Sequence, residues 1–209
     1  MINEDLLLIG AGGHARSCID VIEQEGNFRI AGLVGLQSQL GMKVEGYEVI
    51  ETDDTFSRLV KKIPFALIVI GQLVSSEKRV RLFHQALEAG FEMARIISPS
   101  AHVSSSARIG AGSIVMHGAI LNSGVTVGSN CIINSKALIE HDSKVGNDCH
   151  ISTGAILNGG VIIDEGCFIG SGAVVKEGVT IGKSSVVGMG AILRSNLAAS
   201  SKFLGESLL

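Results

Sequence analysis

Residues 119–142 read AILNSG VTVGSN CIINSK ALIEHD, four successive groups of six residues that share one pattern. The first and third residues of each group are small or apolar, and the sixth is most often Gly, Asn or Asp. The pattern runs without insertion or deletion from Ala101 to Asn196, which makes sixteen hexads. No ordinary helix or hairpin needs a period of six, but a solenoid does, because each coil lays the same side chains on the coil below.

The first and third positions predict the inside of this solenoid. The third is always aliphatic, from Val103 to Leu193. The first holds small or medium side chains, namely Ala101, Ala107, Ser113, Ala119, Val125, Cys131, Ala137, Ser143, Cys149, Ala155, Val161, Cys167, Ala173, Val179, Ser185 and Ala191. Such in–out–in alternation is typical of a short strand, and Gly, Asn and Asp tolerate the backbone angles of a corner. A corner every six residues predicts a three-sided prism with eighteen residues per coil, roughly 25 Å long at about 4.8 Å per coil.

Side chains eighteen residues apart should stack in such a prism. Cys131, Cys149 and Cys167 fall in one column, which Ser113 and Ser185 continue. We interpret the three thiols as reduced packing side chains. The fourth cysteine, Cys18, is isolated, and the sequence contains no CxxC pair, so it gives no support to a zinc-ribbon or redox site.

The first hundred residues alternate between strand and helix patterns. We expect strands at 6–9, 30–34, 65–70 and 91–97, and helices at 15–24 and 77–89. This alternation predicts a small parallel α/β domain, and Pro99 discourages the continuation of either element. The expected organisation is a Rossmann-like α/β domain at 1–98, a parallel β-helix at 99–196 and a C-terminal tail at 197–209.

Composition and charge exclude several partners. The chain of 209 residues has a net charge of −3 and no basic cluster, which argues against nucleic acid and against an anionic membrane. The longest early apolar run, Leu6 to Ile9, follows two acidic residues and is too short for a signal peptide. We therefore expect a cytoplasmic protein.

A glycine loop follows the first expected strand. Residues 10–15 read GAGGHA and precede a helix, where backbone N–H groups bind a phosphate or pyrophosphate. Gly10, Gly12 and Ala15 also fit the spacing of a dinucleotide site, but the second strand ends in Val34-Gly35, without the carboxylate that binds a ribose 2′-OH. The loop favours a nucleotide or nucleotide-sugar phosphate, with a nicotinamide cofactor or a purely structural turn as alternatives.

Two of the six histidines stand out as candidates for chemistry. His141 lies at a corner between Glu140 and Asp142. A carboxylate there can fix its tautomer and raise its basicity, although the same cluster could merely solvate a turn. His150 projects outward from a strand on another prism face, roughly 16–20 Å away at the strand rise. A site using both would lie between subunits of a cyclic trimer.

Of the other four histidines, His14 belongs to the glycine loop and the remaining three are expected to be structural. We expect packing or surface roles for His84, His102 and His117. The spacing of residues 117, 141 and 150 offers no close histidine pair, so no metal is expected.

Four motifs, spread over nearly the whole chain, match one family. They are LIGAGGHA at 8–15, SPSA at 98–101, IEHD at 139–142 and IGSGA at 169–173. Together they resemble the bacterial hexapeptide-repeat sugar acyltransferases of the sialic-acid O-acetyltransferase type. That group includes the N-acetyltransferases that act on nucleotide-linked 4-amino sugars. The resemblance implies a left-handed parallel β-helix and acetyl-CoA as co-substrate.

The resemblance also implies residue roles. His141 would be the general base and Asp142 would raise its basicity, while His150 would meet the thioester region of acetyl-CoA. The remaining site residues would be Gly159, Ser171 and Met189 along the path of CoA, and Gly12, Gly13 and His14 around the nucleotide sugar.

The sequence departs from the family in two places. Members often carry an Asp-Asp pair, which contacts the nucleotide base, where this chain has Val34-Gly35. Many also end in a Gly-x-Pro-Ala turn, where residues 200–205 read SSKFLG. The expected function is acetyl-CoA-dependent N-acetylation of a nucleotide-linked amino sugar. The alternatives are acetylation of a hydroxyl on sialic acid or another sugar, and a non-catalytic nucleotide-binding scaffold.

Overall fold

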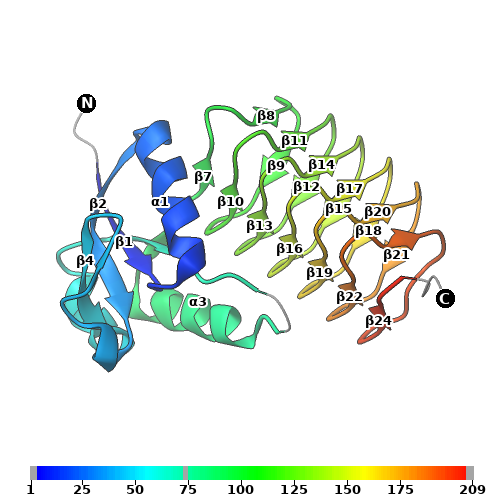
Figure 1. The fold of residues 1–209 in the computed structure, drawn as a ribbon. Helices are drawn as coiled ribbons and strands as arrows, with labels where there is room; N and C mark the ends of the chain where they lie inside the picture. Colours follow the sequence, from blue (N-terminus) through cyan, green and yellow to red (C-terminus); the bar gives the residue numbers. More distant parts are fainter. Residues whose placement is uncertain (1–3, 73–74, 206–209) are drawn as a thin grey trace.

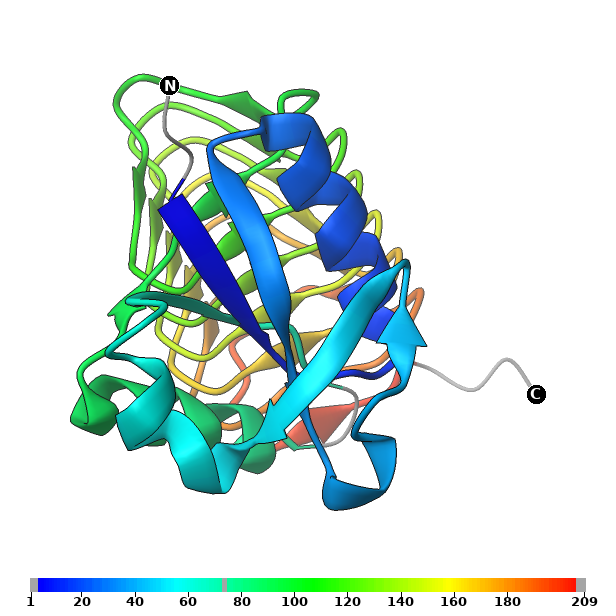
Figure 2. The same cartoon turned by 90° about the vertical axis from the view of Figure 1, so that its left-hand side faces the viewer.

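The computed structural model of the protein describes residues 4–72 and 75–205. An α/β domain lies at one end, and a stack of parallel coils extends from it toward the C-terminus (Figure 1). Seen from the side of the α/β domain, the sheet of that domain lies in front and the coils lie behind it (Figure 2).

The α/β domain is built on one six-stranded sheet. Its strands are β1 (Glu4–Ile9), β2 (Phe28–Gly35), β3 (Lys43–Val44), β4 (Tyr47–Thr52), β5 (Phe65–Ile68) and β6 (Glu92–Met93). The order is β3-β4-β2-β1-β5-β6, parallel throughout except that β3 is antiparallel to β4. Because the chain leaves β1 toward β2 and later returns to β5 on the other side of β1, a crevice forms at the carboxyl ends of β1 and β5.

Helices cover both faces of this sheet. They are α1 (Gly13–Glu25), α2 (Phe56–Leu59) and α3 (Glu77–Ala89), with short 3-10 helices η1 (Gln37–Gln39) and η2 (Asp53–Thr55). Ile19 and Ile22 of α1 pack with Leu6 and Leu8 on one face. The α2 and α3 helices pack on the other face, where Leu7 and Ile9 point. The opposite orientation of successive residues in β1 produces this division.

The coils form a prism with three sheets. The first sheet contains β7 (Ile96–Ile97), β10 (Ile114–Val115), β13 (Ile132–Ile133), β16 (His150–Ile151), β19 (Phe168–Ile169), β22 (Val186–Val187) and β24 (Lys202–Phe203). The second contains β8 (His102–Val103), β11 (Ile120–Leu121), β14 (Leu138–Ile139), β17 (Ile156–Leu157), β20 (Val174–Val175) and β23 (Ile192–Leu193). The third contains β9 (Arg108–Ile109), β12 (Thr126–Val127), β15 (Lys144–Val145), β18 (Ile162–Ile163) and β21 (Thr180–Ile181). Partners are eighteen residues apart, as in Ile132 with His150, which confirms the predicted coil.

The corners use the sixth residue of each hexad in the left-handed conformation. From Gly112 to Gly190 every sixth residue has a positive φ. Glycine, Asn and Asp accept this conformation most readily. Lys136 and Ser184 adopt it with φ of 58° and 56°, so the coil imposes the corner even where the residue type does not favour it.

The cysteine column lies inside the prism, as predicted. Cys131, Cys149 and Cys167 are buried and form no disulfide. Each thiol donates to a backbone carbonyl in the following coil, with Sγ–O distances of 3.0–3.2 Å. Ser113 does the same with its hydroxyl at 2.7 Å. The column therefore satisfies corner carbonyls that the strand ladders leave open.

The α/β domain packs on the outward side of the first sheet. The outward side chains of Ile96, Ile114 and Ile132 are at most 1% exposed and share a core with α1. His117 adds a polar connection, since its imidazole hydrogen-bonds Asp20 of α1 at 2.8 Å and Ser98 at 2.7 Å. This contact gives His117 the structural role expected for it.

Several predicted elements differ from those observed. The strand expected at 91–97 is wrong as a single element, because Glu92–Met93 pairs with β5 whereas Ile96–Ile97 pairs with β10 of the prism. The α1 helix begins earlier than expected, at Gly13, and β3, β4 and α2 were not predicted. Strand pairing of the prism also continues past the repeat to Phe203; residues 206–209 of the expected tail lie outside the described residues.

Candidate functional site

A cavity of about 540 Å³ lies where the crevice of the α/β domain meets the prism. Its walls are the glycine loop after β1, the end of β2, the segment after β5 and the prism residues Asn134, His150 and Ser152. Gly10 has a φ of 125°, and a Cβ there would lie 2.6 Å from the Ile70 side chain, so only glycine lets the chain turn here. Gly12 and Gly13 face open space, which leaves the start of α1 accessible to a ligand.

His14 and His150 come together in this cavity. Their ring centroids are 6.3 Å apart. The Nδ1–H of His150 donates to the carbonyl oxygen of Gln72 at 2.9 Å, and its Nε2 accepts from the Asn134 amide at 3.2 Å. The His14 Nε2 is buried and has no partner within the described chain. His150 therefore projects outward from the prism as predicted, but the α/β domain covers it.

Burial keeps both imidazoles neutral. It lowers the pKa of His150 to about 4, against a smaller opposing effect of the Gln72 hydrogen bond, and the proximity of the His14 imidazole and of the Arg79 guanidinium lowers it further. Burial, and then the Arg79 charge, lower the pKa of His14 to about 4. At neutral pH both imidazoles are therefore uncharged, and they can form hydrogen bonds with a ligand.

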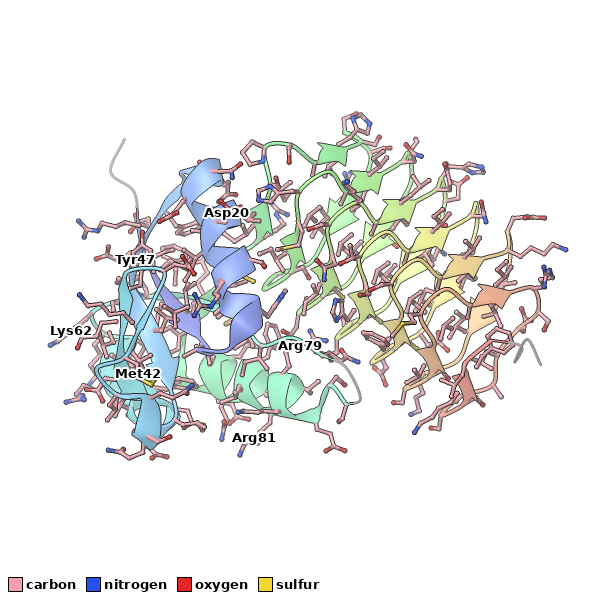
Figure 3. All side chains as sticks on the ribbon, viewed as in Figure 1. Asp20, Met42, Tyr47, Lys62, Arg79 and Arg81 are labelled. Atoms are coloured by element: carbon pink, nitrogen blue, oxygen red, sulfur yellow. The ribbon has the colours of Figure 1, made fainter. Side chains whose placement is uncertain are left out.

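Arg79 fixes the wall of the cavity on the prism side. It lies where α3 approaches the prism (Figure 3) and is 2% exposed. Its guanidinium donates to Gln72 Oε1 at 2.6 Å, to the Asp148 carbonyl at 2.7 Å and to the Asn130 carbonyl. One cation thus holds two stacked prism corners and the side chain beside His150. Burial lowers the pKa of Arg79, and the neighbouring Cys131, Asp148 and Cys149 oppose part of that shift.

His141 and Asp142 form a separate group at the corner after β14. The imidazole Nδ1 is 2.9 Å from Asp142 Oδ2, and both side chains are mostly exposed, at 66% and 77%. An ionised carboxylate only accepts hydrogen bonds, so Nδ1 carries the hydrogen and Nε2 presents its lone pair. This is the arrangement of a positioned base.

Gly159 leaves the space that this imidazole occupies. It stands eighteen residues after His141, in the next coil, and a Cβ at Gly159 would lie 2.7 Å from Nε2. Gly124 plays the same part for Asp142 in the preceding coil, where a Cβ would lie 2.6 Å from Oδ1. The family resemblance implies a place for Gly159 along the path of CoA, and in the structure Gly159 lies against the His141 imidazole.

Ser171 and Met189 lie at another corner, in successive coils after β19 and β22. The Ser171 hydroxyl is 2.9 Å from that of Ser152, which lines the cavity. Met189 is 82% exposed. The predicted site residues therefore divide within one chain. Gly12, Gly13, His14 and His150 share the cavity, with Ser171 at its edge and Met189 in the next coil, whereas His141, Asp142 and Gly159 lie across the second sheet.

Several cavity residues were not found from the sequence. Gln72 follows β5, and the end of a parallel strand beside the glycine loop was an available signal for it. Arg79 stands on α3 in a buried position that the helix pattern did not assign to a cation, and no sequence signal marks Asn134 or Ser152. Among the described residues no group of three metal-ligating side chains occurs, and no helix there has the length and apolarity needed to cross a membrane.

Comparison with family models gives three matches. Residues 5–85 match the PglD N-terminal domain, residues 142–177 the bacterial transferase hexapeptide (six repeats), and residues 160–195 the hexapeptide repeat of succinyl-transferase. A search of curated proteins found no match.

Solved structures match along nearly the whole chain. PerB from Caulobacter crescentus in complex with CoA and GDP-perosamine is 32% identical with a TM-score of 0.88, over 97% of this chain and 94% of that chain. The H141N mutant of perosamine N-acetyltransferase from the same organism, with the same ligands, is 32% identical with a TM-score of 0.89, over 97% and 93%. The acetyltransferase domain of PglB from Neisseria gonorrhoeae FA1090, in complex with acetyl coenzyme A, is 30% identical with a TM-score of 0.85, over 94% and 93%.

Proposed function

The chain belongs to the hexapeptide-repeat sugar acyltransferases that include the N-acetyltransferases of nucleotide-linked amino sugars, and we propose that it transfers the acetyl group of acetyl-CoA to such an amine. The observation that carries this proposal is the His141–Asp142 pair, oriented as a base and given room by Gly159. Similar structures hold CoA with GDP-perosamine, and one of them carries a substitution of a histidine, H141N.

The cavity would hold the nucleotide sugar. The first N–H groups of α1, at Gly13 and His14, face the phosphates, because Gly12 caps the helix without a side-chain hydrogen bond and the space above it is open. The Lys78 side chain, which also lines the cavity, adds positive charge. Neutral His14 and His150 would bind the sugar near the prism, where the acetyl group must arrive.

His141 would accept the proton that the amine loses. The uncharged amine attacks the thioester carbonyl carbon, and the C–N bond forms while Nε2 of His141 takes the N–H proton. The C–S bond then breaks, and the thiolate of CoA leaves and takes up the proton from Nε2 of His141, which returns the imidazole to its neutral form. A backbone N–H in the neighbouring coil would stabilise the oxyanion. Asp142 holds the imidazole orientation throughout.

The active unit in this proposal is a homotrimer, because the site residues lie on the two sides of the second sheet. The outward face of that sheet is apolar, with Ile120 38% and Ile192 49% exposed and with Leu138, Ile156 and Val174 between them. The matching positions of the third sheet are mainly polar, with one exposed apolar residue among them; they hold Arg108, Thr126, Lys144, Ile162 and Thr180. A neighbour packed against the second sheet would bring its His141 corner to this chain's cavity.

The free cysteines support a reducing, cytoplasmic location for this reaction. The reaction itself is tested by thiol release from acetyl-CoA with UDP-, GDP- and CMP-linked sugars that carry either an amine or only hydroxyls at the acceptor position. We expect release with an amine acceptor and its loss in His141→Asn. Release with hydroxyl acceptors alone would identify an O-acetyltransferase. No release with any acceptor would indicate a binding scaffold.

The shared site is tested by complementation. His141→Asn damages the base, and His14→Ala damages the cavity, so each variant alone should be inactive. Co-expressed with different tags and purified as mixed trimers, the two should recover about a third of wild-type activity, because one of the three sites in each mixed trimer combines an intact cavity with an intact base. No recovery in mixed trimers would place both halves of the site in one chain.

A further inference from the structure

Asp53 carries the one negative charge among the described residues of the cavity wall, and the strand register of the sheet sets its position. The register of β2 and β4 pairs Gly35 with Thr52, so Asp53 is the next residue, beside Leu36 at the end of β2. Its side chain is half-buried. Among the described cavity residues it is the only carboxylate. Its backbone carbonyl accepts the Phe56 N–H, whereas its side-chain oxygens make no hydrogen bond or ion pair with residues 4–72 and 75–205.

The cavity has two ends, one beside the prism and one beside β2 and β4, and Asp53 lies at the second. Prism residues meet the cavity on the side of β1 and β5, where His150 bonds the Gln72 carbonyl. Asp53 and Leu36 lie on the other side of the glycine loop, after β4 and β2. If the amine points to the prism and the phosphates lie on the loop, as the proposed function requires, the nucleoside extends toward β2 and β4.

The charge of Asp53 then selects among nucleobases. A carboxylate accepts hydrogen bonds and donates none, and it repels phosphate, so it favours a base edge with N–H donors. Guanine presents two adjacent donors, N1–H and the 2-amino group. Uracil presents a single N–H between two carbonyl oxygens, which a carboxylate repels.

The neighbouring residues fit the same ligand. The Gln39 Oε1 accepts the Leu36 N–H at 2.9 Å, which leaves the Gln39 amide NH₂ as a donor for the guanine carbonyl. Leu36 is 56% exposed and offers an apolar surface for a flat ring. A Cβ at Gly35 would lie 2.9 Å from both Gln39 Oε1 and Val49 Cγ1, so the glycine leaves the room that these two side chains occupy.

We infer that the acceptor of this enzyme is a guanosine diphosphate sugar whose guanine is recognised by Asp53, an inference that rests on the proposed function for the direction of the ligand.

Calorimetric titration of the full-length protein with free nucleotides tests this inference. We expect GDP to bind at least tenfold more tightly than UDP. We also expect GDP to bind severalfold to tenfold more tightly than IDP, which lacks the 2-amino group. UDP binding as tight as GDP binding, or equal affinity for GDP and IDP, would overturn the inference, and neither result depends on whether acetyl transfer occurs.

Asp53→Asn and its neighbour Asp54→Asn form a matched pair. Asp54 is exposed and does not line the cavity. Asp53→Asn should weaken GDP by at least tenfold and remove the preference over IDP, whereas Asp54→Asn should change neither. If Asp53→Asn weakens GDP, IDP and UDP by one common factor, Asp53 contacts the ribose or supports the fold, and the assignment is refuted. If the variant does not fold, the nucleotide series on the wild type decides alone.

The same titration separates this inference from the proposed function. A preference for GDP without thiol release from acetyl-CoA would support the recognition of guanine and exclude the proposed acetyltransferase activity. Thiol release with UDP- or CMP-linked amines in place of GDP-linked ones would support the acetyltransferase activity and overturn the recognition of guanine.

Discussion

Replacing Gly159 by alanine should remove most of the catalytic rate while leaving the fold intact. The new methyl carbon would lie 2.7 Å from Nε2 and 2.8 Å from Cε1 of His141, closer than non-bonded carbon and nitrogen atoms approach. The imidazole is 66% exposed, so it can swing toward solvent, and little strain remains in the chain. The position of Nε2, however, is lost.

The magnitude follows from what is displaced. A reacting group misplaced by about 1 Å costs on the order of 10²-fold in rate, which corresponds to about 2.7 kcal/mol in the barrier at 1.36 kcal/mol per tenfold. Stability should change by less than about 0.5 kcal/mol, as for surface substitutions without strain. Gly159 has no positive φ, and the fifth position of every other hexad carries a side chain.

Steady-state acetyl transfer and urea unfolding measure the two effects. Glu177→Ala is the matched control, because residue 177 is exposed and occupies the same column one coil further on, and its kcat should be unchanged. In a His141→Ala background, Gly159→Ala should have almost no effect, since the methyl group then displaces nothing. Wild-type kcat in Gly159→Ala, or an equal loss in both backgrounds, would refute the reasoning.

Four further outcomes are expected. Asp142→Asn should lower kcat about tenfold by weakening the hydrogen bond that orients the base, less than the 10²–10⁴-fold loss from removing the base; an unchanged kcat would leave Asp142 a turn residue. Between pH 7 and pH 5 the free energy of unfolding should fall by about 2 kcal/mol through His150 alone, because its pKa of about 4 in the folded state lies below the 6.5 of an unfolded chain, which takes up the proton first. In urea titrations His150→Gln should remove the His150 share of that slope and leave the share of His14, whose pKa is also about 4; an unaltered slope would contradict the prediction. His117→Ala should lower the free energy of unfolding by about 1 kcal/mol, because it breaks the hydrogen bonds to α1 and to the domain junction. Ile156→Asp should yield inactive monomers in sedimentation experiments, and an active monomer would exclude the trimer as the active unit.

The hexad predicts the inside of the prism and nothing about what covers its outside. The position of a residue within its hexad predicts whether it lies in a strand, at a corner or inside the prism, because each coil packs on the preceding one in the same way. His150 occupies an outward position like those of Ile120 and Ile162, yet it is 5% exposed and they are each 38% exposed. The α/β domain makes the difference, and no local pattern encodes which sheet it covers.

The α/β domain was harder to predict because its short elements take their place from the sheet. Neither β3 nor β4 carries a strong period of its own, so Asp53 could not be assigned to the cavity from the sequence. On α3, Arg79 is buried whereas Leu87 is 44% exposed, the reverse of what polarity suggests. The prism corners satisfy the guanidinium with backbone carbonyls, a contact that exists only once two distant parts of the chain meet.

One broad apolar face of α1, formed by Ala15, Cys18, Ile19, Val21 and Ile22, packs both on its own sheet and on the prism. Moving the two parts of the molecule apart would expose Ile96, Ile114 and Ile132 to water, at about 1.5–3 kcal/mol for each side chain. At more than about 4 kcal/mol in all, the opened form is populated at roughly one molecule in 10³ or fewer. The closed arrangement therefore prevails, and the two parts of the molecule hold their relative positions before either substrate arrives.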